Sequence, residues 1–350
     1  MPLLTTTIGA YPKPDFVPIP DWFQTPSGPD TRHPTKEYLQ AIAAMGEEAT
    51  ALFARGVGQV VADQVGAGID IPTDGEVRRE NYIHYHCRHL EGIDFDTLTS
   101  KEVRGGAYTA ELPSITGPVT ARDRFLAADW RLAQGTTDRP VKITMPGPMT
   151  IADTTVDLHY DDERRLGADL AQALNGEILS LAQAGCTWIQ VDEPVFARKL
   201  DPALAFGLDH LEHCFHGVPA GVMRVVHICC GYPDRLDRDD YPKADPEAYP
   251  RLADAVEDSC IDAVSIEDAH RHNDLRLLER FAETRVILGV VAIAKSRIEP
   301  VEEIRARLGA ALAHIDADRL IAAPDCGLGL LGRERALEKL RNLCAAARCY

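Results

Sequence analysis

Short apolar runs rich in β-branched residues alternate with helical patterns along most of the chain. A buried strand gives a short apolar run that ends in polar or turn residues, whereas a helix repeats its apolar positions every three or four residues. The clearest helix is predicted over Glu163–Ala184, where Leu and Ile recur on one face and Gly185 provides a stop signal. Further helices are expected at Pro246–Asp258, Leu275–Thr284, Pro300–His314 and Gly332–Ala347.

Strands alternating with helices are typical of a parallel sheet with right-handed crossovers. Eight such strands predict a TIM-type (β/α)8 barrel, an α/β fold, and a doubly wound open sheet is the alternative. The long segment Val77–Arg139, after the second strand, is interpreted as an insertion above the barrel mouth with helices or a hairpin, and residues 1–350 as a single domain. The predicted strands are Leu4–Ala10, Ile69–Glu76, Val141–Pro148, Thr187–Pro194, Arg224–Cys230, Ala263–Asp268, Val286–Ala292 and Leu320–Gly327.

The amino-acid composition favours some classes of protein and argues against others. Hydrophobic residues make up 45% of the 350 positions, which is enough for a sizeable core. The net charge of -17 argues against a nucleic-acid partner, because phosphate backbones are bound by clustered cations. No apolar run approaches the roughly 20 residues of a membrane span, and no signal peptide is visible. Nine cysteines without the spacing of a secreted disulfide framework favour a cytoplasmic protein with free thiols.

Acidic residues, histidine and cysteine gather at the ends of the predicted strands. In a barrel these ends converge on one face, where active sites are built. A single acidic residue at such an end could simply cap the next helix, but His, Cys and Glu are poor caps. The ends concerned are Thr73–Glu76, Asp192–Pro194, His227–Gly231, Glu267–Asp268 and Asp325–Gly327.

Residues His227 and Cys229 stand two apart on one predicted strand, so their side chains share a face, while Cys230 points the other way. Together with Glu267 and Cys326 they offer one nitrogen, two sulfurs and one oxygen, a set that suits zinc. Core packing is the alternative for the His-x-Cys pair on its own. A zinc ion with thiolate ligands would deprotonate a substrate thiol and leave it nucleophilic, which favours alkyl transfer to sulfur over hydrolysis.

These residues stand in segments that match a known family. The chain resembles the catalytic C-terminal barrel of cobalamin-independent methionine synthase from Thr5 to about Ala347. The resemblance rests on TTTIGAYP, IPTDGEVRR, PGPMTI, IQVDEP, HICCG, VSIED, GVV and APDCGLG, in the family's order. The chain has no room for the family's second, N-terminal barrel, so the resemblance implies a short, core-only member.

The resemblance also implies a function for particular residues. Glu267 would be the catalytic residue, a zinc ligand that gives way to the thiol of homocysteine. The substrate ammonium would meet a pair of carboxylates, which is sensible charge complementarity. The methyl donor would be methyl-tetrahydrofolate or a corrinoid carrier protein. The implied residues are His227, Cys229, Glu267 and Cys326 for zinc, and Ile8, Gly9, Glu76 and Asp192 for the substrate.

Three positions depart from the family. Ala10 replaces a Ser that contacts the substrate carboxylate, and Ala294 replaces the His that donates a proton. The Trp near the folate site is absent from Ala152–Val156. Because methyl-folate transfer needs protonation of the leaving amine, these departures affect the donor more than the thiol. Other residues that could supply the proton are His84, His86, Lys295 and Arg297.

Two other functions stay open. A zinc-dependent thiol alkyltransferase resembling epoxyalkane:coenzyme M transferase would need cations for a sulfonate where Glu76 and Asp192 stand. A non-catalytic protein would bind zinc or an amino acid without turnover. The leading prediction is a zinc methyltransferase that forms methionine from homocysteine, with another small thiol as the alternative acceptor.

Overall fold

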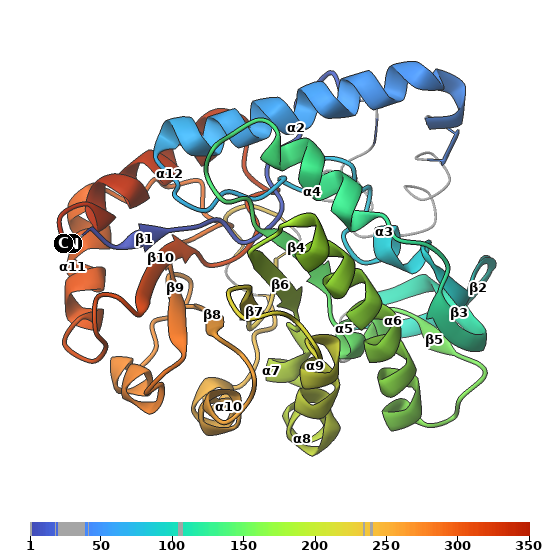
Figure 1. The fold of residues 1–350 in the computed structure, drawn as a ribbon. Coiled ribbons are helices and arrows are strands. Elements are labelled where there is room, and N and C mark those ends of the chain that lie inside the picture. Colours follow the sequence, from blue (N-terminus) through green and yellow to red (C-terminus); the bar gives the residue numbers. More distant parts are fainter. Residues whose placement is uncertain are drawn as a thin grey trace.

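The central feature of the fold is a curved, seven-stranded sheet with the strand order β1-β10-β9-β8-β7-β6-β4 (Figure 1). Every neighbouring pair is parallel, so the carboxyl ends of the strands lie at one edge. The computed structural model describes residues 2–17, 19, 39–40, 42–103, 108–233, 235–238 and 241–350. The strands are β1 (Leu4–Thr5), β4 (Ile143–Pro146), β6 (Trp188–Asp192), β7 (Met223–Ile228), β8 (Ala263–Glu267), β9 (Arg285–Val291) and β10 (Leu320–Pro324).

The prediction of a strand at Ile69–Glu76 is wrong. This segment makes one isolated parallel bridge on each side, through Thr6 and through Lys142. Pro72 has no N–H to give to a ladder, and the N–H of the next residue donates to the side chain of Gln64 at 3.0 Å. The α/β fold with a parallel sheet is confirmed, whereas closure into an eight-stranded barrel stays a prediction.

The helices follow the predicted pattern most closely where their ends are capped. Helix α6 covers Glu163–Ala184 as predicted: the Asp162 carboxylate accepts hydrogen bonds from the first-turn N–H groups, and Gly185 ends the helix at φ +107°. Helices α10 (Ala248–Glu257), α11 (Val301–Ala311) and α12 (Arg333–Ala347) lie inside their predicted ranges. The remaining short helices after β6 are α7 (Val195–Arg198), α8 (Leu200–Pro202), the π-helix η2 (Ala203–Gly207) and α9 (Leu208–Cys214).

Two helical segments differ from the prediction. The segment predicted as a helix over Leu275–Thr284 is a 3₁₀-helix, η3 (Leu275–Arg280). It stops early because the next N–H groups, from residues 282 to 284, donate to the carboxylate of Glu257. Helix α2 (Glu47–Ala67) has no counterpart in the prediction, since three glycines interrupt its apolar pattern, and it packs against α12.

The segment 77–139 contains both helices and a hairpin. Helices α3 (His84–Cys87) and α4 (Leu126–Gln134) flank an antiparallel hairpin of β2 (Leu90–Val103) and β3 (Tyr108–Ala121). The hairpin forms a second sheet with β5 (Val156–Asp157). The ammonium of Lys101 on β2 donates to three carbonyls at 2.8 to 3.3 Å near the end of α5 (Pro148–Asp153). The hairpin is thereby fastened beside the sheet's carboxyl edge.

A small apolar layer lies against the concave face of the main sheet and supports the polar strand ends. Alternation places His227 and Ser265 on the same face as this layer, two residues further along β7 and β8. The members of the layer are Ile8, Val225, Ala263, Ile287, Ile321 and Ala323.

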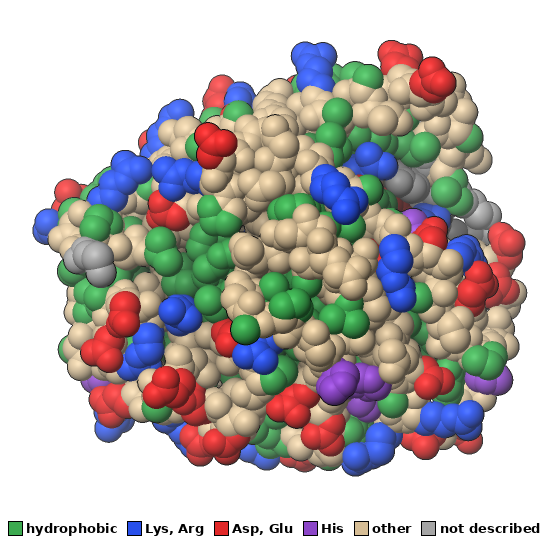
Figure 2. Space-filling model, viewed as in Figure 1, with side chains coloured by type: hydrophobic (Ala, Val, Ile, Leu, Met, Phe, Trp, Pro, Cys, Tyr) green, Lys and Arg blue, Asp and Glu red, His purple; other side chains and the backbone are tan. Residues whose placement is uncertain are grey.

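Acidic and basic side chains are interspersed over the face seen in Figure 2. In the described part of the chain, no helix is both long enough and apolar enough to cross a membrane.

Candidate active site

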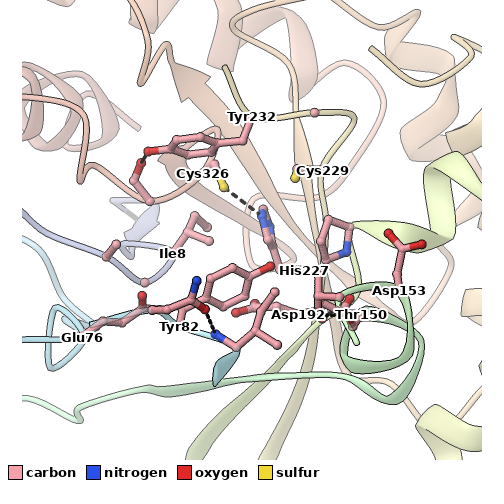
Figure 3. Close-up of a pocket in the computed structure, with 18 of the residues that line it drawn as sticks. Ile8, Glu76, Tyr82, Thr150, Asp153, Asp192, His227, Cys229, Tyr232 and Cys326 are labelled. Atoms are coloured by element: carbon pink, nitrogen blue, oxygen red, sulfur yellow. Dashed lines mark hydrogen bonds between the residues drawn. The ribbon is translucent and has the colours of Figure 1, made fainter. Parts of the chain in front are cut away.

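A cavity of about 140 Å³ opens at the carboxyl ends of the strands (Figure 3). Its wall combines strand ends of the main sheet with side chains from α3, β3 and α5. Seven of the eight predicted site residues line it, namely Ile8, Gly9, Glu76, Asp192, His227, Cys229 and Cys326.

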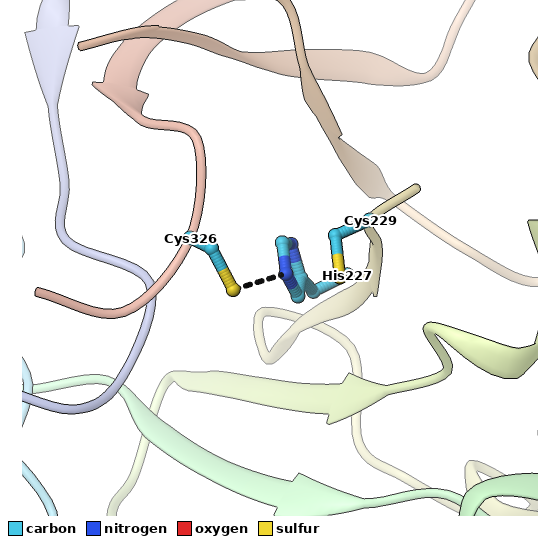
Figure 4. Close-up of side chains that lie close together, drawn as sticks. All are labelled: His227, Cys229 and Cys326. Carbon is cyan, nitrogen blue, oxygen red and sulfur yellow. Dashed lines mark hydrogen bonds between the residues drawn. The ribbon is translucent and has the colours of Figure 1, made fainter. Parts of the chain in front are cut away.

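Three of the predicted metal ligands come together in this cavity (Figure 4). The ligand atoms of His227, Cys229 and Cys326 all lie within 4.8 Å of one another, and Cys326 Sγ is 3.4 Å from His227 Nε2. Ser265 Oγ is 2.9 Å from His227 Nδ1, which leaves Nε2 for the sulfurs or a metal. Zinc bonds of about 2.0–2.3 Å in a tetrahedron place ligand atoms about 3.3–3.8 Å apart. The donor set and its spacing therefore fit zinc.

His227 and Cys229 are buried and Cys326 is partly buried, and the pKa values of the three side chains depend on one another. A hydrogen bond from Cys326 lowers the pKa of the Cys229 thiol well below its ordinary range. The same hydrogen bond, with burial, raises the pKa of Cys326. Burial opposes a charge on His227, but the hydrogen bond to Cys229 together with the negative charges of Cys229 and Asp192 outweighs it and raises the pKa of His227. These shifts thus favour a thiolate at Cys229, and a divalent cation would favour a second thiolate at Cys326.

The fourth predicted ligand, Glu267, stands outside this group. Its Oε1 accepts a hydrogen bond from Lys243 Nζ at 2.7 Å, and its Oε2 accepts one from the N–H of Cys230 at 3.2 Å. Burial raises the pKa of Glu267. The thiol of Cys230 accepts a hydrogen bond from Arg271, so it does point away from the group, as alternation along the strand predicts.

A sharp turn directs the carboxylate of Glu76 into the cavity. Gly75 and Glu76 both have left-handed φ angles, +67° and +57°, and such a backbone is uncommon for a non-glycine residue and is found at functional sites. Thr144 Oγ1 donates to Glu76 Oε1 at 2.9 Å. A Cβ atom at Gly9 would lie 2.5 Å from the same oxygen, so the approach of these two residues requires glycine.

The second carboxylate, Asp192, is 7% exposed and accepts a hydrogen bond from Gln190 at 2.7 Å. Burial raises the pKa of Asp192 to about 7 and also raises the pKa of Glu76. A carboxylate removed from water is stabilised strongly by a cation. The pair therefore suits a positively charged group on a ligand.

Two buried cationic side chains lie near these carboxylates, and the sequence analysis did not identify them. Arg79 is 1% exposed, and its guanidinium lies 3.5 Å from Glu76 Oε1. Lys142 is fully buried, and burial lowers the pKa of its ammonium to about 7 against the opposing charge of Asp192. Arg79 follows a turn, between Arg78 and Glu80, and Lys142 lies between Val141 and Ile143 at the start of β4, so neither local sequence indicates that these cations lie beside the carboxylates.

The rest of the cavity wall is formed by residues that the sequence analysis did not assign to a site. Helix α5 is positioned by Glu193, whose carboxylate accepts hydrogen bonds from the N–H groups of Met149 and Thr150 and from the Thr150 hydroxyl at 2.8 to 3.0 Å. The signals available were the PGPMTI segment and the Tyr- and His-rich stretch after Glu76. The residues of this wall include Asn81, Tyr82, His84, Leu112, Thr150, Asp153, Thr154, Arg198 and Tyr232.

The position of the family's proton donor lies away from this cavity. Ala294 is fully buried, its N–H donates to His270 Nε2 at 3.2 Å, and it is not among the residues of the cavity wall. His84 does line the cavity, but burial lowers its pKa to about 4, so it is neutral at pH 7. Arg297 pairs with Glu303 at the surface.

Comparison with known proteins agrees with the sequence motifs. The family model described as "Cobalamin-independent synthase, Catalytic domain" matches residues 3–208 and 246–349, with His227 and Cys229 between the two matched ranges. A methionine synthase of Saccharolobus solfataricus is 30% identical over 349 residues, which are 98% of this chain and 93% of the relative. One of Sulfolobus acidocaldarius is 29% identical over 97% of this chain and 90% of its own length.

A solved structure adds the fold. The B12-independent methionine synthase from Shewanella sp. W3-18-1, in complex with selenomethionine, superposes with a TM-score of 0.86 at 30% identity, covering 100% of this chain and 98% of that one. The match of the family model over most of the chain and the full-length likeness to these proteins lead to one conclusion: the chain belongs to the cobalamin-independent methionine synthase family.

Proposed function

We propose that this protein transfers a methyl group to the thiol of homocysteine and forms methionine, with zinc as its metal. The observation that carries the proposal is that one cavity is lined both by the His227, Cys229 and Cys326 group and by two buried carboxylates. Zinc, when bound, supplies a Lewis acid that makes a thiol ionise at neutral pH. His227, Cys229 and Cys326 would hold the metal, and Glu267 would be a fourth ligand that the substrate thiol could replace.

The chain's own residues orient the amino acid. The ammonium binds between Glu76 and Asp192, while the backbone of Ile8 and Gly9 forms the adjoining wall. This leaves the substrate side chain directed toward the sulfurs of the metal group. Two thiolate ligands keep the substrate sulfur electron-rich, which suits attack on a methyl group.

The methyl donor approaches from the wall formed by α3, the hairpin and α5. Candidate donors are methyl-tetrahydrofolate and a methyl-corrinoid carried by a partner protein. We include in the proposal that residues 1–350 act as a single domain, with a barrel closed between β1 and β4 through the isolated parallel bridges of Ile71 and Thr73, and with the segment 77–139 as an insertion at its mouth.

The direct test is a methyl-transfer assay with the zinc-loaded protein. Homocysteine and each candidate donor are supplied separately, and methionine is measured by mass spectrometry. Coenzyme M serves as the competing acceptor and is expected to react poorly, because its sulfonate would face Glu76 and Asp192. Preferred use of coenzyme M, or binding of homocysteine without turnover on any donor, would contradict the proposal.

Glu76→Gln and Asp192→Asn are each expected to weaken methionine binding by roughly 10- to 100-fold, the equivalent of one charged hydrogen bond. Each amide preserves shape and removes the charge that faces the ammonium. Calorimetric titration with methionine measures the effect, and the zinc content should not change. The control ligand is the analogue with hydrogen in place of the amino group, whose affinity should not fall. Normal methionine binding by both variants would show that these carboxylates do not bind the substrate ammonium.

A further inference from the structure

Both oxygens of the Glu267 carboxylate are occupied by donors outside the metal group. The stronger donor is the ammonium of Lys243, at 2.7 Å from Oε1, and the N–H of Cys230 is the other. Glu267 is only 2% exposed and the Lys243 side chain 17%, so this ion pair is largely shielded from water. A buried carboxylate gains far more from such a partner than a surface one does.

The chain between β7 and α10 fixes the position of this ammonium. The N–H of Ala244, the next residue, donates to the carbonyl of Cys230 at 2.7 Å, which ties the connection to the end of β7. The Lys243 ammonium also lies 5.2 Å from the centroid of the Tyr241 ring. The lysine is thus placed by its surroundings and is not a freely moving surface side chain.

Lys243 reaches Glu267 from outside the substrate cavity. It lines a neighbouring groove, which meets the cavity at Asp153, Arg198 and Gly231, and it is not among the residues of the cavity wall. A substrate in the cavity would therefore not need to displace the lysine in order to reach the metal group. Glu267 thus lies beside the end of β7 that carries the metal group: its Oε2 accepts a hydrogen bond from the N–H of Cys230, the residue after Cys229, while its Oε1 faces Lys243.

We infer that Lys243 is a positioning residue that receives the Glu267 carboxylate when it leaves the metal, and so keeps the fourth metal position open to a substrate thiol. The inference rests on the proposed function. Lys243 draws negative charge from the carboxylate and its own positive charge repels a nearby metal ion, so pairing with Lys243 weakens the hold of Glu267 on the metal. Without Lys243, a released carboxylate would be left buried with a single N–H donor, and release would be disfavoured.

Lys243→Met is expected to tighten zinc binding by about tenfold or more in the absence of thiol, because Glu267 then has the metal as its one cationic partner. The measurement is competition with a chromophoric zinc chelator at pH 7.5, using the full chain. Lys243→Gln should act in the same direction. The matched control is Lys199→Met, which removes a lysine of the same groove that pairs with Asp153 at 3.0 Å, and it should leave zinc affinity unchanged.

A double variant distinguishes the proposed role of Lys243 from a general effect of the substitution on stability. In Glu267→Gln protein, adding Lys243→Met should no longer raise zinc affinity, because the amide competes weakly for either cation. An equal gain in that background, or no gain in Lys243→Met beyond that of Lys199→Met, would overturn the role of Lys243. If instead the protein binds no zinc, or binds it equally well after Cys326→Ser, the result contradicts the proposed function itself and not only the role of Lys243.

Discussion

Cys326→Ser is expected to lose tightly bound zinc and to lower methyl transfer by more than about 100-fold, the upper end of the losses seen when a group that merely supports a ligand is removed. The side chain supplies one of the three atoms that lie within 4.8 Å of one another in the metal group. It also donates the hydrogen bond that lowers the pKa of the Cys229 thiol. A serine hydroxyl is a harder and far less acidic ligand, so the variant loses both contributions.

X-ray absorption of the zinc-loaded protein checks this prediction directly. Two sulfurs should surround zinc in the resting protein, three with homocysteine, and one in the resting variant. Cys349→Ser is the matched control, because this cysteine is exposed near the chain's end and should be dispensable. Full zinc content and activity in Cys326→Ser would remove the metal site from the proposal.

Methyl-tetrahydrofolate alone is expected to be a poor donor, slower than a methyl-corrinoid or a methyl sulfonium by about 10²–10⁴-fold, the usual contribution of a general acid. A leaving amine needs a proton, whereas a corrinoid or a sulfide leaves without one. His84 on the cavity wall is neutral at pH 7, and burial raises the pKa of Tyr82 well above its usual value, so each gives up a proton poorly.

Initial rates with the donors at equal concentration and neutral pH test this expectation. The control is a protein of the same family that carries the donor histidine, assayed with the same folate. If the two proteins turn over methyl-tetrahydrofolate at similar rates, another residue supplies the proton, and ordinary folate-dependent methionine synthesis is the function.

The sequence predicted correctly those parts of the molecule whose structure depends on residues close together in the chain or on rules common to parallel sheets. Helix α6 has the predicted bounds because Asp162 and Gly185 cap it within the sequence itself. The grouping of His227, Cys229 and Cys326 followed from strand alternation and from the convergence of strand ends, which hold for any parallel sheet of this kind. These features need no knowledge of distant contacts.

The features that the sequence did not predict depend on contacts between residues far apart in the chain. Lys243 lies in the connection between β7 and α10 and Glu267 ends β8, and nothing in either segment indicates that they pair. The hairpin takes its place beside α5 through Lys101, whose acceptors are about fifty residues away along the chain. The segment 69–76 begins with the Ile-Asp-Ile alternation of a strand, but Pro72 and the Gln64 side chain interrupt its ladder.

The short helix α5 has a consequence for how the site assembles during folding. A six-residue helix cannot nucleate by itself in water, and its first turn is satisfied by Glu193, more than forty residues later in the sequence. The wall that carries Thr150 and Asp153 therefore becomes ordered only once the end of β6 is in place. We expect the backbone amides of α5 and of the end of β6 to exchange with solvent as one cooperative unit, so that the catalytic cavity forms late and opens as a whole.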